Sequence, residues 1–201
     1  MRFVGRTRSS MLSVADQSIS SLGSLLLAAS VARVSTPTAF GSFALLYGIS
    51  WLMTAGLRAS LGETLLIRSQ ELSPADLRLA EGGALSIALI VSGVVGAGML
   101  LLDRLHGSAL IAVWACAFPC TAAQDSLRYI AIARGRRPVT LVLDGLWLVI
   151  FGALGVAFSS SSDPEGRAWL LAWVVGAGAS SVMGAVILRP TPFPRATRWL
   201  R

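Results

Sequence analysis

The chain has 201 residues, of which 54% are hydrophobic and only 13% are charged, and its mean hydropathy is +0.70. Because an ordinary soluble domain carries about 25% charged residues, this composition excludes a typical soluble protein and favours a single membrane domain. The formal net charge is +7, and all seventeen basic residues are arginines, a usage typical of a GC-rich bacterial genome.

The first half of the chain predicts three membrane-spanning helices. An arginine-bearing segment, 1–15, precedes the first span at 16–34. Arginines before an apolar run resemble a secretory signal, but the further apolar spans that follow favour a retained first helix. Pro37 marks the start of the second span, 39–66, because proline is best tolerated at the first turn of a helix. The third span covers 79–102.

The second half predicts three more spans and a basic tail. The spans cover residues 108–133, 139–158 and 167–188, and the tail covers 189–201. A bilayer core about 30 Å thick needs about 20 apolar residues per helix, so each stretch is long enough to cross it. The links are short, so neighbouring helices are expected to be antiparallel. We therefore predict an all-α, polytopic membrane protein with six transmembrane helices in one bundle, 16–188.

The arginines fall mainly on one side of the predicted spans. That side holds Arg2, Arg6, Arg8, Arg68, Arg78, Arg128, Arg134, Arg136, Arg137, Arg189, Arg195, Arg198 and Arg201. The opposite side holds Arg33, Arg104 and Arg167. Since arginine-rich loops stay inside, this pattern predicts a multi-pass protein of the bacterial inner membrane with both termini cytoplasmic. The scatter over several segments argues against a nucleic-acid partner and is explained by topology and contact with anionic membrane lipids.

Charged residues inside spans are costly and usually face a bundle interior or a wet cavity, so they are the candidate functional residues. Those in the cytoplasmic halves of the spans are Asp16, Arg58, Glu63, Asp125, Arg128 and Asp144. Asp125 and Arg128 are three residues apart, so they can pair on one helix face. Arg58 has no acid three or four residues away, so its partner must come from another span or a ligand, and its planar fork suits a phosphate. The alternative is that these charges only neutralise one another or reach the inner surface.

The sequence contains no recognisable catalytic or metal-binding motif. His106, in a predicted external turn, is the only histidine and is expected to be solvated. Cys116 and Cys120 are four residues apart in one apolar helix without further ligands nearby, so they are expected to serve packing rather than zinc binding. We expect no enzymatic activity, no metal and no cofactor.

One group of motifs carries a family resemblance. These motifs are DQSISSL at 16–22, VAR at 31–33, PTAFGSFA at 37–44, LRASLGETLL at 57–66, QDSLRY at 124–129, GRRP at 135–138 and LDGLW at 143–147. With them, most of the chain resembles the amino-terminal lobe of the lipid-linked oligosaccharide (O-antigen) flippases, members of the multidrug/oligosaccharidyl-lipid/polysaccharide exporter superfamily. The resemblance implies a six-helix, MATE-like lobe.

The resemblance also implies a function. Such a protein moves a polyprenyl-pyrophosphate-linked glycan across the inner membrane by alternating access, for cell-surface polysaccharide biosynthesis. Arg58 and Arg128 would then contact the pyrophosphate. Other polar residues would line the cavity or bind a coupling ion, namely Asp16, Gln17, Glu63, Asp125 and Asp144. The hypothesis requires a hydrated pocket beside these groups that opens toward the cell interior.

Family members have a second lobe, whereas the predicted bundle corresponds to one. Three explanations stay open: a homodimer, a second lobe on a separate polypeptide, or a truncated and inactive exporter homologue. A rival hypothesis is a non-transporting membrane scaffold in a glycan-assembly complex, whose role would survive neutral replacement of Arg58. An intramembrane enzyme acting on lipid phosphates is disfavoured, because the spans lack a histidine with nearby acids.

Overall fold

The computed structural model describes the backbone of residues 2–106, 109–158 and 165–190, and the side chains of these residues except 2–14, 16, 106 and 109. Within these ranges every regular element is a helix and none is a strand, which confirms the predicted all-α class. The elements are α1 (Arg2–Val34), α2 (Pro37–Leu57), the π-helix η1 (Arg58–Glu63), α3 (Thr64–Arg68), α4 (Pro74–His106), α5 (Ala109–Ala133), α6 (Arg137–Phe158) and α7 (Arg167–Leu188). α2, η1 and α3 follow one another without a break and form one rod.

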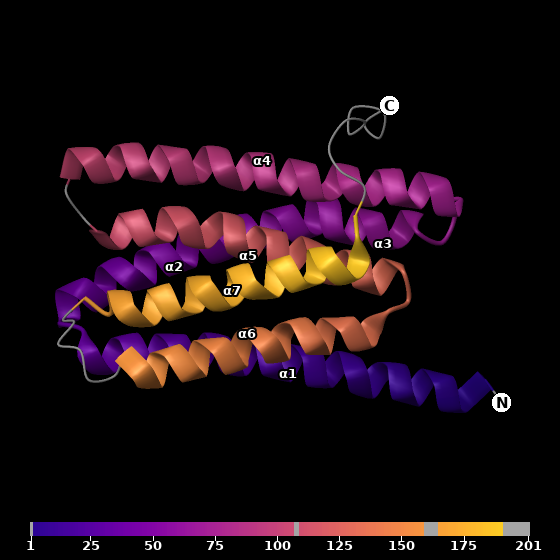
Figure 1. The fold of residues 1–201 in the computed structure, drawn as a ribbon, viewed down its shortest axis with the longest axis horizontal. Helices are drawn as coiled ribbons and strands as arrows, with labels where there is room; N and C mark the ends of the chain where they lie inside the picture. The colour runs from indigo at the N-terminus through magenta and orange to yellow at the C-terminus, as the bar shows by residue number, and fades with distance from the viewer. Residues whose placement is uncertain (1, 107–108, 159–164, 191–201) are drawn as a thin grey trace.

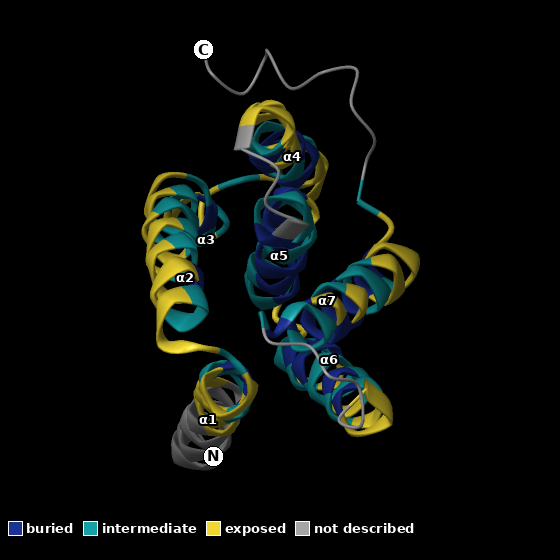
Figure 2. Ribbon diagram, turned by 90° about the vertical axis from the view of Figure 1, so that its left-hand side faces the viewer, coloured by how far each residue is buried: buried dark blue, intermediate teal, exposed yellow. Residues whose placement is uncertain are grey.

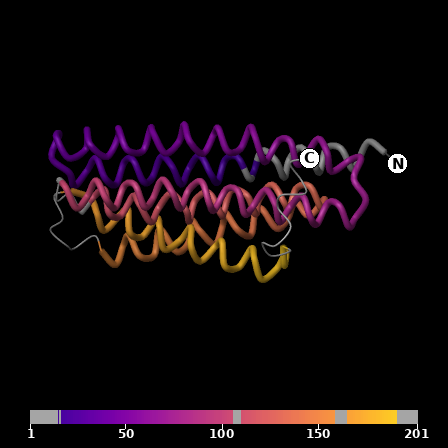
Figure 3. Tube along the Cα trace, turned by 90° about the horizontal axis from the view of Figure 1, so that it is seen from above, coloured from indigo at the N-terminus to yellow at the C-terminus, as the bar shows by residue number. Residues whose placement is uncertain are grey.

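The helices run side by side in one bundle (Figure 1). Figures 2 and 3 show three layers: α1 with α2 and α3 on one side, α4 and α5 in the middle, and α6 with α7 on the other side. α5 is the central helix, since it packs against α4, α6, α7 and the α2–η1–α3 rod. Its close approach to α4 depends on Gly96, where a Cβ atom would lie 2.5 Å from the carbonyl oxygen of Ala115.

Among the described residues, five helical rods are long and apolar enough to cross a membrane. They are Pro37–Arg68, Pro74–Leu105, Leu110–Ala133, Arg137–Phe158 and Arg167–Leu188. Large apolar side chains cover their outward faces; Leu52, Val94 and Val156 are 75%, 68% and 73% exposed. Because so much apolar surface is unfavourable in water and favourable in lipid, the bundle is that of a multi-pass membrane protein.

The first predicted span is helical too, although it is not among these five rods. α1 covers Arg2–Val34, so the helix begins well before the predicted residue 16. Polar residues lower its apolar character, and four of them, Gln17, Ser20, Ser21 and Ser24, line a cavity inside the bundle. The predicted tail lies outside the described residues from residue 191 onward.

Two apolar cores leave a polar layer between them. One core is rich in aromatic residues and includes Phe43, Trp114 and Phe151. The other is aliphatic and includes Leu65 and Leu127. The aliphatic core lies toward the end of the bundle where the α3–α4 and α5–α6 links are found, which we refer to as the arginine-rich end. Along α5, Asp125 lies between the last aromatic-core residue, Ala117, and the first aliphatic-core residue, Leu127.

Candidate functional site

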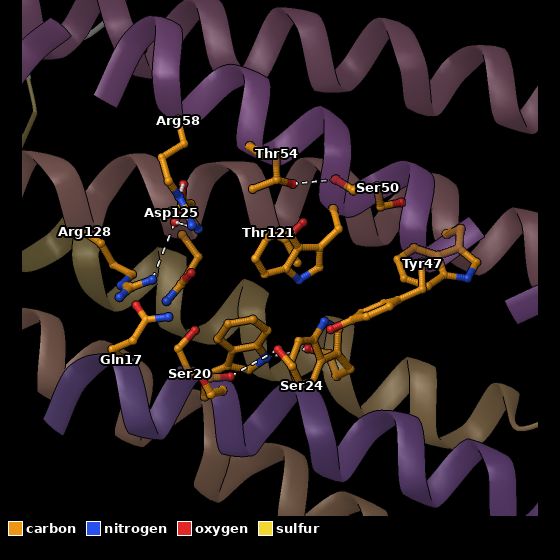
Figure 4. Close-up of a pocket in the computed structure, with 17 residues that line it drawn as sticks. Gln17, Ser20, Ser24, Tyr47, Ser50, Thr54, Arg58, Thr121, Asp125 and Arg128 are labelled. Atoms are coloured by element: carbon orange, nitrogen blue, oxygen red, sulfur yellow. Dashed lines mark hydrogen bonds and ion pairs between the residues drawn. The ribbon is translucent and has the colours of Figure 1, made fainter. Parts of the chain in front are cut away.

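A cavity of about 270 Å³ lies inside the bundle. Its walls come from α1, α2, η1, α5, α6 and α7, whereas α4 contributes none of the described lining residues. Figure 4 shows that the charged side chains of Arg58, Asp125 and Arg128 gather at one end, while Tyr47 lies at the other end. Hydroxyl-bearing side chains, among them Thr54, occupy the space between these ends. The cavity therefore has a charged end and an aromatic end.

The charged end is organised by a bidentate ion pair between two helices. Arg58 Nη2 donates to Asp125 Oδ1 at 2.8 Å, and Arg58 Nε donates to Asp125 Oδ2 at 3.2 Å. The side chain of Arg58 is 31% exposed and that of Asp125 is 9% exposed. Arg58 belongs to η1 and Asp125 to α5, so the pair connects the α2–η1–α3 rod to the central helix. The sequence left two possible partners for Arg58, another span or a ligand, and in the structure the partner is Asp125 of another span.

A second arginine extends the network to α6. Arg128 lies 3.5 Å from Asp125 through Nη1 and 3.3 Å from Asp144 Oδ2 through Nε. Asp144 is almost fully buried, and Gln124 donates from its side-chain amide to Asp144 Oδ1 at 2.5 Å. We name the four charged residues Arg58, Asp125, Arg128 and Asp144 the cavity cluster. A buried ionic network of this kind fixes the orientation of its arginines.

The π-helix η1 places Arg58 in the cavity wall. A π-helical turn holds one more residue than an α-helical turn, and such turns are frequent at functional sites. Gly62 lies under the ring of Tyr129 from α5, where a Cβ atom would be 2.8 Å from the ring. The wider turn therefore lies where an aromatic side chain packs directly on the backbone. Ser60 Oγ donates to the carbonyl oxygen of Gly56 at 2.7 Å across the start of this turn.

The middle of the cavity is lined by hydroxyl groups whose hydrogens are already used. Ser24, Thr54 and Thr121 donate to backbone carbonyl oxygens four residues earlier, at 3.1, 2.8 and 3.0 Å. A hydroxyl oxygen that donates in this way keeps acceptor lone pairs for another group. This part of the wall therefore presents acceptors and suits a ligand with O–H or N–H donors.

Aromatic rings line much of the cavity wall, and Tyr47 and Trp114 form the aromatic end, with ring centroids 5.9 Å apart. The lining rings are Tyr47, Trp51, Trp114, Trp147 and Trp173. Trp147 and Trp173 are in contact, with ring centroids 4.1 Å apart, and Trp147 Nε1 donates to the carbonyl oxygen of Trp173 at 3.0 Å. Such rings offer broad apolar faces beside a few polar groups, which is a usual composition for a small-molecule site.

A second ionic cluster lies at the arginine-rich end, away from the cavity. Arg134 pairs with Glu81 through Nε to Oε1 at 2.8 Å and through Nη2 to Oε2 at 2.5 Å, and its Nη1 donates to the Leu188 carbonyl oxygen at 2.5 Å. Glu81 is fully buried on α4. The hydrogen bonds that Arg134 donates to the Glu81 carboxylate raise the pKa of Arg134 above its ordinary value. We name Glu81, Arg134 and this carbonyl group the Arg134 cluster; it joins α4, α5 and α7.

The structure brings most of the predicted site residues together. Arg58, Arg128 and Asp125 line the cavity, and Asp144 lies directly behind Arg128. Gln17 lines the cavity from α1 (Figure 4). The other two predicted residues are not placed in the wall. Glu63 is exposed and is not among the lining residues, because its position on η1 faces away from the cavity. The side chain of Asp16 lies outside the described residues.

Several residues of the site were not predicted from the sequence. Gln124 was noted only within a motif, and Glu81 was not singled out, although it lies within the third predicted span. The signal for Glu81 is its neighbours Ala80, Gly82 and Gly83, since small residues around an acid allow another helix to approach closely. The aromatic lining had no sequence signal beyond the presence of tryptophans in four different helices.

Within the described part of the chain, no group of three or more metal-ligating side chains could hold a metal ion. Cys116 and Cys120 are free thiols on α5. No protein-family model, curated protein or solved structure matches the chain. The site therefore has to be interpreted from its own geometry, which is an arginine–carboxylate network beside a polar, aromatic-walled cavity in an apolar bundle.

Proposed function

We propose that the chain is a flippase-like transporter lobe that moves a lipid-linked oligosaccharide across the bacterial inner membrane by alternating access, for cell-surface polysaccharide biosynthesis. The observation that carries this proposal is the cavity of about 270 Å³ with Arg58 and Arg128 in its wall. A void with cationic donors is costly in a membrane bundle, so its presence argues for a ligand rather than for packing.

The two ends of the cavity correspond to the two parts of a pyrophosphate-linked sugar. The arginine forks of Arg58 and Arg128 suit phosphate oxygens, which accept bidentate hydrogen bonds. The hydroxyl acceptors and aromatic faces suit a sugar ring, which has O–H donors on its rim and apolar C–H faces. In Figure 4 the charged groups lie at one end, Thr54 lies in the middle and Tyr47 lies at the other end, an order that suits a phosphate followed by a sugar.

The size of the cavity limits what one lobe holds. Ligand pockets usually have about 300–1,000 Å³, so a cavity of about 270 Å³ is at the small end of this range. It accommodates the pyrophosphate with the adjoining sugar, and we assign the rest of the glycan to the space shared with a second lobe. That lobe is a second copy of the chain or a separate polypeptide. α2 has a broad free surface for it, since Phe43 is the one residue of α2 described as buried.

Binding by the purified chain in lipid nanodiscs tests the proposal before a second lobe is needed. We expect a polyprenyl pyrophosphate that carries a glycan to bind, and Arg58→Gln to weaken binding about 10- to 100-fold, since hydrogen bonds to charged groups contribute about 1.5–3 kcal/mol. Arg33→Gln is the matched control, because Arg33 is an exposed arginine in the last turn of α1 and is not among the described residues that line the cavity. Wild-type protein that binds this lipid no better than unphosphorylated polyprenol would contradict the proposal.

A non-transporting membrane scaffold is the second candidate function. One observation favours it: both cavity arginines already have carboxylate partners, as packing alone would require. The two functions differ in cells that carry Arg58→Gln. Surface display of the polysaccharide is lost if the chain transports, and it is kept if the chain only holds other proteins, because Arg58 lines an internal cavity.

A further inference from the structure

We propose that Asp125 is the binding site of a proton that enters the cavity together with the anionic head group. The inference rests on the proposed function and adds a second bound species, H⁺, to the site. It follows from the fact that the arginine fork that best suits a phosphate is already occupied by a carboxylate.

The first step is that Asp125 already occupies the hydrogen-bonding fork of Arg58. The Nε and Nη2 groups of Arg58 point the same way and hold both oxygens of Asp125, at 3.2 and 2.8 Å. This is also the geometry in which a guanidinium group grips two oxygens of a phosphate. A phosphate that binds with the full fork must therefore take the place of Asp125.

The consequence for Asp125 is the second step. Its side chain is 9% exposed, and its other cationic neighbour, Arg128, lies 3.5 Å away and is shared with Asp144. Once displaced, an ionised Asp125 would face an anion at close range in a poorly solvated site, and like charges in such a site favour proton uptake by one of them. In the loaded state a solvent hydronium ion, supplied by the buffer, transfers its proton to an Asp125 oxygen and becomes water, and the resulting O–H donates to the phosphate.

The choice of Asp125 over other acids is the third step. Among the described residues that line the cavity, Asp125 supplies the carboxylate. Asp144 lies behind Arg128 and is held by the Gln124 amide at 2.5 Å, so it stays in place and keeps Arg128 oriented. Two arginines contact Asp125, namely Arg58 of η1 and Arg128 of α5. The other titratable or polar groups around it are farther away: Glu63 of η1, Tyr129 of α5, Asp144 of α6 beyond Arg128, and Gln17 of α1.

If the phosphate instead binds Arg58 without displacing Asp125, removing the Asp125 charge has the opposite effect on anion binding. A phosphate that used the remaining N–H groups of Arg58 would leave Asp125 in place, where it would hold the arginine in position. Removing the Asp125 charge would then weaken anion binding, because the arginine would lose its orientation. If Asp125 competes with the anion, the same removal strengthens binding.

The test uses the full chain in nanodiscs and a prenyl pyrophosphate diester, whose own charges do not titrate near neutral pH. Calorimetry in two buffers of different ionisation enthalpy gives the number of protons taken up. We expect about one proton per bound anion, and hence an affinity that falls about tenfold for each pH unit above neutrality. Asp125→Asn is expected to bind more tightly, with no proton uptake and no pH dependence. The control Glu71→Gln, exposed in the α3–α4 link, is expected to behave as wild type.

The outcomes separate this inference from the proposed function. Wild-type protein that binds the diester without proton uptake, or an Asp125→Asn variant that binds it more weakly, overturns the proton site and leaves anion transport standing. Wild-type protein that does not bind the diester overturns both. If Asp125→Asn does not fold, the proton count of the wild type decides by itself.

Discussion

The cavity cluster and the Arg134 cluster are built from the same chemical groups but differ in what surrounds them. Each contains an arginine that holds a carboxylate on another helix through two hydrogen bonds. Arg58 and Asp125 border a cavity, and their acid is shared with a second arginine at 3.5 Å. Arg134 is not among the described residues that line this cavity, and its Nη1 group donates to the last carbonyl of α7.

The difference shows how to distinguish a binding site from a structural contact when both contain buried charges. In the Arg134 cluster each charged group has close partners and the acid is fully buried, so nothing is left to bind. In the cavity cluster the ion pairs of Arg128 with Asp125 and Asp144 are longer, and Arg128 borders a cavity lined by polar and aromatic side chains. We therefore expect the first cluster to govern stability and the second to govern ligand binding.

The largest expected effect comes from breaking the Arg134 cluster. Glu81→Ala removes one partner of a buried pair and leaves Arg134 without its carboxylate, which is expected to lower the free energy of unfolding by about 3–5 kcal/mol. Unfolding in detergent micelles with increasing denaturant measures this loss. The matched control Glu71→Ala changes an exposed acid and is expected to cost less than about 0.5 kcal/mol.

A double variant shows whether the loss comes from the stranded charge. Replacing both Glu81 and Arg134 by leucine removes the charge that Glu81→Ala leaves behind, so much of the lost stability should return. A double variant that is less stable than Glu81→Ala would show instead that the cap on the α7 carbonyl is the main contribution of Arg134.

The next effect concerns the cavity cluster and the π-helix that presents it. Deleting Ala59 removes the extra residue of η1, so the turn can become α-helical. Because the loss of one residue and the loss of the wide turn compensate, Arg58 keeps its orientation relative to α3, and binding of a polyprenyl pyrophosphate is expected to fall less than about threefold. Deleting Ala55, in the α-helical part of α2, has no wide turn to absorb it and turns the preceding lining residues by about 100° relative to Arg58, so binding is expected to fall at least about tenfold. Equal losses in the two deletions would show that the π-helical turn itself is needed for ligand binding.

The sequence predicted the bundle and the members of the cavity cluster for clear physical reasons. Apolar runs of membrane length mark the spans, and counting along helices placed Arg58, Asp125, Arg128 and Asp144 at similar depths. It could not predict the partners, because pairing depends on how helices rotate about their axes. The π-helix has no hydrophobic period of its own, since η1 is short and lies within a continuous apolar rod.

Glu81 was not singled out for the same reason: the sequence does not show how helices rotate toward one another. Glu81 lies near the beginning of α4, which starts at Pro74, five residues before the predicted span. A position near a predicted span end suits a solvated acid, so nothing in the sequence distinguished a surface residue from a buried one. Only the contact with Arg134, from a helix more than fifty residues later in the chain, decides it.

A smaller effect tests the packing under the π-helix. Gly62→Ala places a methyl group 2.8 Å from the ring of Tyr129, which is rigid at that point, so α5 and η1 must move apart. The expected cost is about 1–3 kcal/mol of unfolding free energy, with weaker ligand binding because Arg58 moves with η1. Gly48→Ala is the control, since a Cβ atom there meets nothing within 4 Å. A stable Gly62→Ala variant with normal binding would show that the contact tolerates displacement.

The smallest expected effect tests whether the aromatic rings of the cavity contact the sugar. Trp147→Phe removes the N–H group that donates to the Trp173 carbonyl at 3.0 Å and keeps an aromatic ring in the wall. The expected loss of stability is about 0.5–1.5 kcal/mol, the net value of one hydrogen bond. Because Trp147 is one of the rings that line the cavity, the variant should weaken binding of a glycan-bearing polyprenyl pyrophosphate more than binding of the sugar-free lipid. Equal weakening for both lipids would mean that the rings do not contact the sugar, so the aromatic lining would have to be assigned to the lipid chain.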